Sequence, residues 1–76
     1  MKILFENKDI DIMVDDERVV VINYKTEKIK KHNHQMYGVD NETIISLLKE
    51  TGASQEDIKE YEKSHMFDNV RELENN

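Results

Sequence analysis

Two histidines separated by one residue, His32 and His34, have the spacing in this sequence that best suits a metal ion. On a β-strand, side chains two residues apart point to the same side, so both imidazoles could bind one metal. A third ligand would have to come from His65 or a carboxylate, because the sequence has no cysteine and no His-Glu-x-x-His motif. One hypothesis is therefore a small metal-binding protein. The simpler interpretation is two surface histidines in a basic strand, with no bound cofactor.

Carboxylates are numerous, but their spacing does not indicate catalysis. Asp9 and Asp11 share one face of an expected strand, and residues 15–17 form an expected turn. A general acid needs a carboxyl group whose pKa is raised in an apolar pocket, and a chain of 76 residues has little room for one. The sequence also lacks a Gly-rich phosphate loop, an EF-hand pattern and a recognisable nucleophile motif. We therefore predict that the protein is not an enzyme.

The acidic residues are concentrated in the second half of the chain. Residues 1–38 carry seven Lys/Arg and seven Asp/Glu, whereas residues 39–76 carry four and ten, which accounts for the net charge of −6. This charge disfavours direct binding to nucleic acid or membranes and favours a partner with a basic surface. No apolar run approaches the roughly 20 residues of a membrane span, and the apolar stretch at the start of the chain is too short for a signal peptide. We expect a cytoplasmic protein.

The main functional hypothesis follows from this charge. A small acidic, non-enzymatic protein can regulate or inhibit a larger protein by binding its basic surface. In size and charge the chain is similar to small acidic phage and mobile-element proteins that occupy the cationic groove of nucleic-acid enzymes. The predicted partner-binding residues lie on the second expected helix or directly after it, and they are Glu56, Asp57, Glu60, Tyr61, Glu62 and Met66.

Residues 44–61 suggest an alternative, a DNA-binding regulator. Leu48, Gly52 and Ile58 have the spacing of the packed residue, turn glycine and core aliphatic of a helix-turn-helix. However, residues 55–64 would be the recognition helix, and their excess of carboxylates opposes docking against phosphates. Residues 41–73 also resemble the three-helix ubiquitin-associated type of domain, through the run Glu50-Thr51-Gly52-Ala53-Ser54 and an expected third helix at 68–73. We transfer no function from that resemblance.

The first half has the pattern of antiparallel strands. Residues 2–6, 9–14 and 18–24 are predicted strands, separated by turns at Asn7-Lys8 and at residues 15–17. Residues 25–37 are compatible with a strand or a helix, and we favour a polar edge strand, where lysines oppose pairing with other chains.

The second half has the pattern of helices. Asp40 or Asn41 is placed to cap a helix, and Gly52 suits its left-handed end. Ser54 is placed to cap a second helix, and residues 67–73 form either its continuation or a third helix.

These elements predict a single α+β domain over residues 1–76, with a β half (1–38) and an acidic helical half (39–76). A meander of three to four strands, residues 2–34, precedes two to three helices, residues 41–73, packed on one face. The expected core residues are Ile10, Ile12, Val20, Ile22, Ile44, Leu47, Leu48, Ile58 and Phe67. This choice leaves Val19 and Val21 on the opposite sheet face, which suggests a homodimer that covers them.

Overall fold

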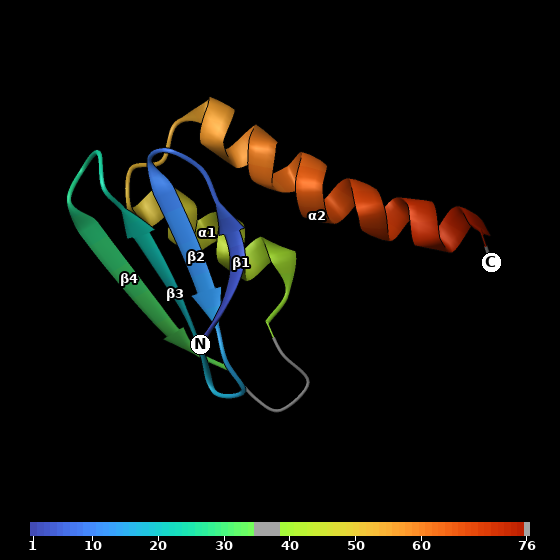
Figure 1. Cartoon of the computed structure of the whole chain (residues 1–76), viewed down its shortest axis with the longest axis horizontal. Helices are drawn as coiled ribbons and strands as arrows, with labels where there is room; N and C mark the ends of the chain where they lie inside the picture. The colour runs from blue at the N-terminus through green and yellow to red at the C-terminus, as the bar shows by residue number, and fades with distance from the viewer. Residues whose placement is uncertain (35–38, 76) are drawn as a thin grey trace.

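The computed structural model describes the backbone of residues 1–34 and 39–75, with side chains described for 1–34 and 39–65. The elements in chain order are β1 (Lys2–Glu6), β2 (Ile10–Val14), β3 (Arg18–Asn23), β4 (Lys28–Asn33), α1 (Asn41–Glu50) and α2 (Gln55–Asn75). The strands form one antiparallel sheet in the order β1-β2-β3-β4, and the two helices follow it (Figure 1). The predicted α+β meander, including its fourth, polar edge strand, is confirmed.

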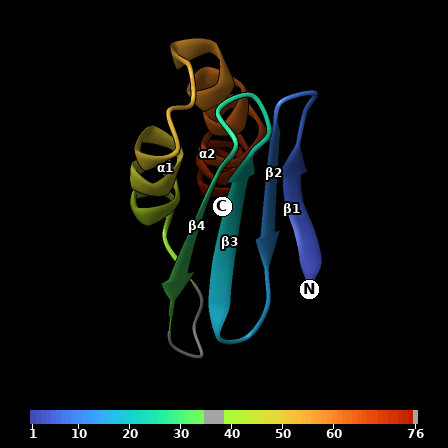
Figure 2. The same cartoon turned by 90° about the vertical axis from the view of Figure 1, so that its left-hand side faces the viewer.

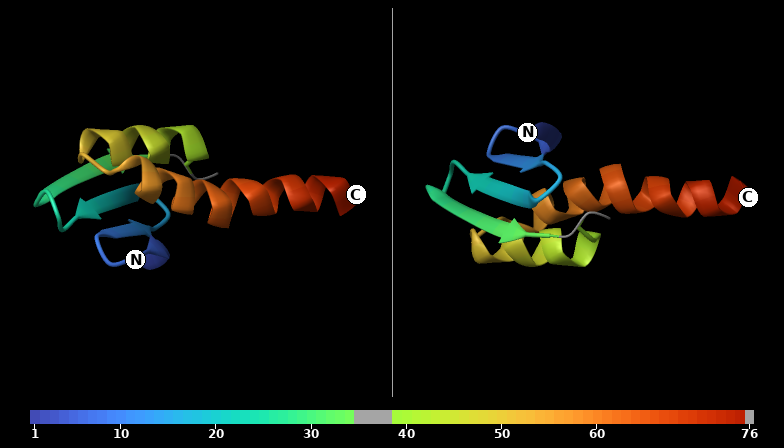
Figure 3. Two further views of the ribbon diagram at one scale, coloured as in Figure 1. Left: turned by 90° about the horizontal axis from the view of Figure 1, so that it is seen from above. Right: turned by 90° about the horizontal axis from the view of Figure 1, so that it is seen from below.

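The helices lie together on one face of the sheet (Figure 2). α1 contacts β3 and β4, while the beginning of α2 packs through Tyr61 on Phe5 of β1. α2 then runs on past the edge of the sheet, which gives the molecule its long dimension of 41 Å (Figures 1 and 3).

Across the described residues, neither helix is long and apolar enough to cross a membrane.

Each of the three hairpin turns is closed by an Asn or Asp side chain. Asn7 Oδ1 accepts hydrogen bonds from the backbone N–H groups of residues 9 and 10, at 2.9 and 2.8 Å. Asp15 Oδ1 accepts from residues 17 and 18, and Asn23 Oδ1 from residues 25 and 26. These side chains supply the acceptor that the turn backbone lacks. They recur every eight residues, so β2 and β3, the strands between successive turns, have nearly equal lengths.

The helix-covered face of the sheet is built from alternate residues of β2 and β3. Ile12 lies opposite Val21, and Val14 lies opposite Val19, in the antiparallel register. Val19 and Val21 are therefore the helix-facing residues of β3, and both are fully buried. The predicted assignment of Val20 and Ile22 to this helix-covered face was wrong by one residue, because four successive apolar residues carry no alternation that could define the phase. Val20 is buried as predicted, at 7% exposed, but on the opposite face and outside the main core cluster.

α1 begins and ends at the predicted residues. The carboxylate of Asp40 accepts a hydrogen bond of 2.8 Å from the backbone N–H of Thr43, and the Thr43 hydrogen bonds lower the pKa of Asp40. At the other end Gly52 has φ +82°, and a Cβ there would lie 3.1 Å from the Thr26 methyl group. Only glycine meets both requirements without strain.

α2 is capped by a reciprocal pair of side chains. Ser54 Oγ accepts from the N–H of Asp57 at 3.1 Å, and the Asp57 carboxylate accepts from the N–H of Ser54 at 3.3 Å. From there α2 continues unbroken to Asn75, so residues 67–73 are its continuation. Over the described residues the second half forms two helices, and the three-helix arrangement suggested by residues 41–73 does not form.

The remaining core predictions largely hold. Ile10, Ile12, Ile44, Leu47, Leu48 and Ile58 are buried as predicted, whereas the side chain of Phe67 lies outside the described residues. Tyr61 joins this core, and so do two polar residues that the sequence did not indicate, Asn23 and Thr51.

Candidate functional site

Tyr61, one of the six predicted partner-binding residues, lies inside the molecule. Its side chain is 0% exposed, and its ring packs edge-on against Phe5 with centroids 5.7 Å apart. Its hydroxyl donates a hydrogen bond of 2.5 Å to Asn41 Oδ1, which connects α2 to the start of α1. Burial raises the pKa of Tyr61 to about 12. Tyr61 therefore joins the two helices to the sheet and offers no surface to a partner.

Asp57 and Glu60 meet at the β1–β2 turn. The side-chain amide of Asn7 donates to the carboxylate of Asp57 at 3.0 Å and to that of Glu60 at 2.8 Å. Asp57 is half-buried and also belongs to the helix cap, whereas Glu60 is exposed. One turn amide thus bridges two carboxylates on successive turns of α2. The two groups fix the helix on the sheet, and Glu60 still presents charge to solvent.

The other predicted residues do not gather into one patch. Glu56 is exposed, Glu62 is half-buried, and the side chain of Met66 lies outside the described residues. Glu56 and Glu62 are six positions apart, which separates them by about 120° around the helix axis. The outward face of α2 carries Glu56 and Glu60 together with Lys59 and Lys63, so its charges alternate in sign.

The acidic excess belongs to the helical layer as a whole. Residues 39–65 contain seven Asp/Glu and three Lys, a net charge of −4. Glu42 and Glu50 on α1 are exposed contributors that the choice of α2 residues missed. A charge count over both expected helices would have included them. We call the glutamates of the two helices the acidic helical surface, and they are the exposed Glu42, Glu50, Glu56 and Glu60 with the half-buried Glu62.

The edge strand β4 has the opposite charge. Residues 25–34 contain four Lys and one Glu, a net charge of +3, and every residue of β4 is exposed. The molecule therefore has a cationic sheet edge and an anionic helical layer. This separation of charge is the main electrostatic feature of the described residues.

The two histidines do not form a metal centre with other ligands among the described side chains. His32 is exposed on β4, and His34 follows the strand and donates its backbone N–H to the Glu17 carbonyl at 2.8 Å. His65 lies elsewhere, against the ring of Tyr61 at 4.7 Å. Within residues 1–34 and 39–65, no three His, Cys, Asp or Glu side chains are grouped to hold a metal.

The helix-turn-helix hypothesis gains no electrostatic support from α2. Its outward face has as many Glu as Lys over residues 56–63, whereas a helix that docks against phosphates needs an excess of cations.

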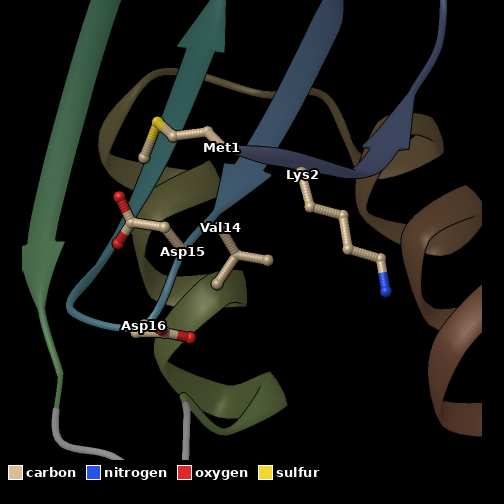
Figure 4. Close-up of a pocket in the computed structure, with 5 residues that line it drawn as sticks. All are labelled: Met1, Lys2, Val14, Asp15 and Asp16. Atoms are coloured by element: carbon tan, nitrogen blue, oxygen red, sulfur yellow. The ribbon is translucent and has the colours of Figure 1, made fainter.

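A shallow pocket of about 360 Å³ lies at the end of the β1–β2 pair, lined by Met1, Lys2, Val14, Asp15 and Asp16 (Figure 4). Backbone hydrogen bonds from residues 17 and 18 hold the pKa of Asp15 below its ordinary value. The Lys2 ammonium points away from both carboxylates (Figure 4). Asp15 is thus a turn-closing group, because its ionised form is already bound by the backbone.

Comparisons with protein-family models, with curated proteins and with solved structures find no match to this chain. Its function must therefore be argued from the arrangement of its own residues.

Proposed function

We propose that this protein is a small acidic, non-catalytic regulator or inhibitor that binds a larger protein through its acidic helical surface. The observation that carries the proposal is the net charge of −4 on residues 39–65, which form the layer outside the sheet. A charge excess of this kind steers association with a cationic patch and suppresses binding to anionic partners.

The partner we propose is a protein that handles nucleic acid. Such proteins expose a groove lined with Lys and Arg to bind phosphates, and an anionic helical layer complements the same groove. The resemblance in size and charge to inhibitors from phages and mobile elements supports this choice of partner. A cytoplasmic location belongs to the same proposal.

Affinity capture from a lysate of the source organism identifies the target. The tagged full chain serves as bait, with and without nuclease treatment. We expect one basic protein to stay bound after nuclease treatment. Recovery of nucleic acid and its associated proteins alone, lost on digestion, would instead favour the helix-turn-helix hypothesis.

Charge reversal then tests which surface binds the captured target. Glu42→Lys with Glu56→Lys changes two exposed carboxylates of the helical layer and leaves the Asn7 contacts intact. The matched control, Asp16→Lys with Glu17→Lys, makes the same change of charge in the exposed β2–β3 turn. We expect at least about a tenfold loss of affinity for the first variant and at most about twofold for the second. Equal losses would contradict binding through the helical surface.

A further inference from the structure

The sheet face opposite the helices is apolar and uncovered. The large hydrophobic residues that are most exposed within the described chain are Met1, Ile3, Tyr24 and Ile29. Ile3 is 55% exposed and Ile29 57%, and both lie on this open face, as their register with Met13 and Ile22 shows. Tyr24 lies there too, since its hydroxyl bonds to Asp11 at 2.6 Å. Met13 of β2 and Ile22 of β3 are partly exposed between them, whereas Val20 is buried. Apolar side chains that are at least partly exposed on every strand of so small a sheet indicate an interaction surface.

The register places these apolar residues in an oblique band. One row across the four strands reads Ile3, Met13, Val20 and Lys31. The next row, about 7 Å farther along the strands, reads Glu6, Asp11, Ile22 and Ile29. The apolar residues therefore run from β1 in the first row to β4 in the second. We call them the apolar band, comprising Ile3, Met13, Val20, Ile22 and Ile29.

The charged residues occupy the two corners beside the band. Glu6 and Asp11 form an acidic corner on β1 and β2. Lys31 lies at the opposite corner on β4, next to Arg18, which precedes Val20 by two residues on β3. Arg18 is 50% exposed, and its 3.9 Å contact with Asp15 is a weak surface ion pair that leaves its charge available.

This arrangement is complementary to itself. A two-fold axis along the apolar band places the bands of the two copies against each other. The same rotation brings the acidic corner of each copy over the basic corner of the other, one pair on each side of the axis. The band extends about 14 Å across three strand spacings and about 7 Å along the strands, so the strands of the two copies would cross at roughly 50°. A generic apolar partner would not need this diagonal placement of opposite charges.

We infer that the open face binds a second copy of this chain and forms a two-fold symmetric dimer. The acidic helical layers then face outward on both sides, which leaves two copies of the proposed target-binding surface accessible. Four strands about 4.8 Å apart and about 20 Å long give a contact of about 400 Å² per copy. This is half of a standard interface, so the dimer should be weak, with a dissociation constant on the order of 100 μM.

A charge-swap experiment tests both the face and the symmetry. The first variant, Glu6→Lys with Asp11→Lys, has two basic corners, and the second, Arg18→Glu with Lys31→Glu, has two acidic corners. By sedimentation velocity we expect the unaltered chain to dimerise between about 10 μM and 1 mM, and each variant alone to stay monomeric. An equimolar mixture of the two variants should dimerise again, because each basic corner then meets an acidic one.

Circular dichroism melts establish that the variants fold. Glu42→Lys with Glu50→Lys is the matched control on α1 and should dimerise as the unaltered chain does. If a charge-swap variant does not fold, Ile29→Lys replaces it, since that exposed side chain is not needed by the core, and we expect at least about a tenfold weaker dimer. A chain that is monomeric at about 1 mM, association unchanged in the variants, or no recovery in the mixture would each overturn the inference.

Discussion

The two faces of the sheet have similar apolar content but different surroundings. On the covered face, Ile12 and Val21 are fully buried beneath the helices. On the open face, Ile22 and Ile29 are neighbours across β3 and β4, and Ile29 is 57% exposed. The same residue types therefore serve stability on one face, while on the other they remain available for a partner. Apolar content alone does not identify the core, and the position of the helices decides it.

Polar groups differ between the faces in the same way. Asn23 is 2% exposed on the covered face, and its amide donates to the Thr51 carbonyl at 3.2 Å, where α1 ends. On the open face the Tyr24 hydroxyl bonds to Asp11 in contact with solvent. The buried bond positions a helix, whereas the exposed one competes with water and contributes less to stability.

Truncating one isoleucine on each face should give the largest contrast. Ile12→Ala removes a fully buried side chain, and we expect it to lower the free energy of unfolding by about 3 kcal/mol through lost burial and a cavity. Ile29→Ala should cost less than about 0.5 kcal/mol, because water already reaches that side chain. Urea denaturation at a concentration below dimer formation measures both. Equal losses would mean that the open face is covered in the monomer.

The polar pair should give the next largest contrast. Asn23→Ala removes the amide bound to Thr51 and the acceptor of two turn N–H groups, so we expect a loss of about 2 kcal/mol. Tyr24→Phe removes one exposed hydrogen bond and should leave the urea midpoint unchanged. If Asn23→Ala left the free energy of unfolding unchanged, the turn would not hold the end of α1.

The attachment of α2 to the covered side can be weakened without touching the core. Asn7→Asp keeps the acceptor that closes the turn but replaces the amide donor with a third carboxylate beside Asp57 and Glu60. We expect a loss of about 1 kcal/mol at neutral pH, measured by urea denaturation. Adding Glu60→Lys should restore part of the loss. If it does not, the contribution of Asn7 lies in the turn alone.

Local patterns in the sequence were sufficient to predict the elements of the fold. Ile10, Ile12 and Val14 alternate with polar or less buried residues, which defines both a strand and its inward face. Helix ends were also predictable from single residues. Asp40 and Ser54 accept hydrogen bonds from the first backbone N–H groups of a helix, and Gly52 adopts the positive φ that ends one. The spacing of eight residues between Asn7, Asp15 and Asn23 is a further local signal, because each side chain closes a hairpin turn.

Relations between distant segments were not predictable in the same way. The phase of β3 depends on its register with β2, and its own run of apolar residues does not contain that information. Asn7 meets Asp57 and Glu60 across 50 and 53 positions, so their role in joining turn and helix required the tertiary structure. The burial of Tyr61 likewise required the tertiary structure, whereas Glu42 and Glu50 are recognisable from the charge of the sequence alone.

Titration of Tyr61, which packs against the covered face, and of Tyr24, on the open face, compares the surroundings of the two faces. Burial raises the pKa of Tyr61 to about 12, whereas the hydrogen bond to Asp11 is the main cause of the raised pKa of Tyr24. Tyrosinate absorbance follows both groups in a Tyr37→Phe background, which removes a third signal from outside the described residues. Asp11→Asn should return the pKa of Tyr24 toward 10.0 and leave that of Tyr61 unchanged.

Tyr61, which packs against the covered face, should also make stability depend on alkaline pH. An unfolded chain loses the Tyr61 proton near pH 10.0, but the folded chain keeps it to about 12. Unfolding then releases a proton, so the free energy of unfolding should fall as pH rises through this window and be unaffected by Tyr61 below it. Tyr61→Phe should remove the part of this fall in unfolding free energy that Tyr61 causes. Tyr24→Phe should reduce the fall by a smaller amount, since the Tyr24 hydroxyl is exposed. Equal effects would mean that the two hydroxyls have the same environment, which the separation of covered and open faces does not allow.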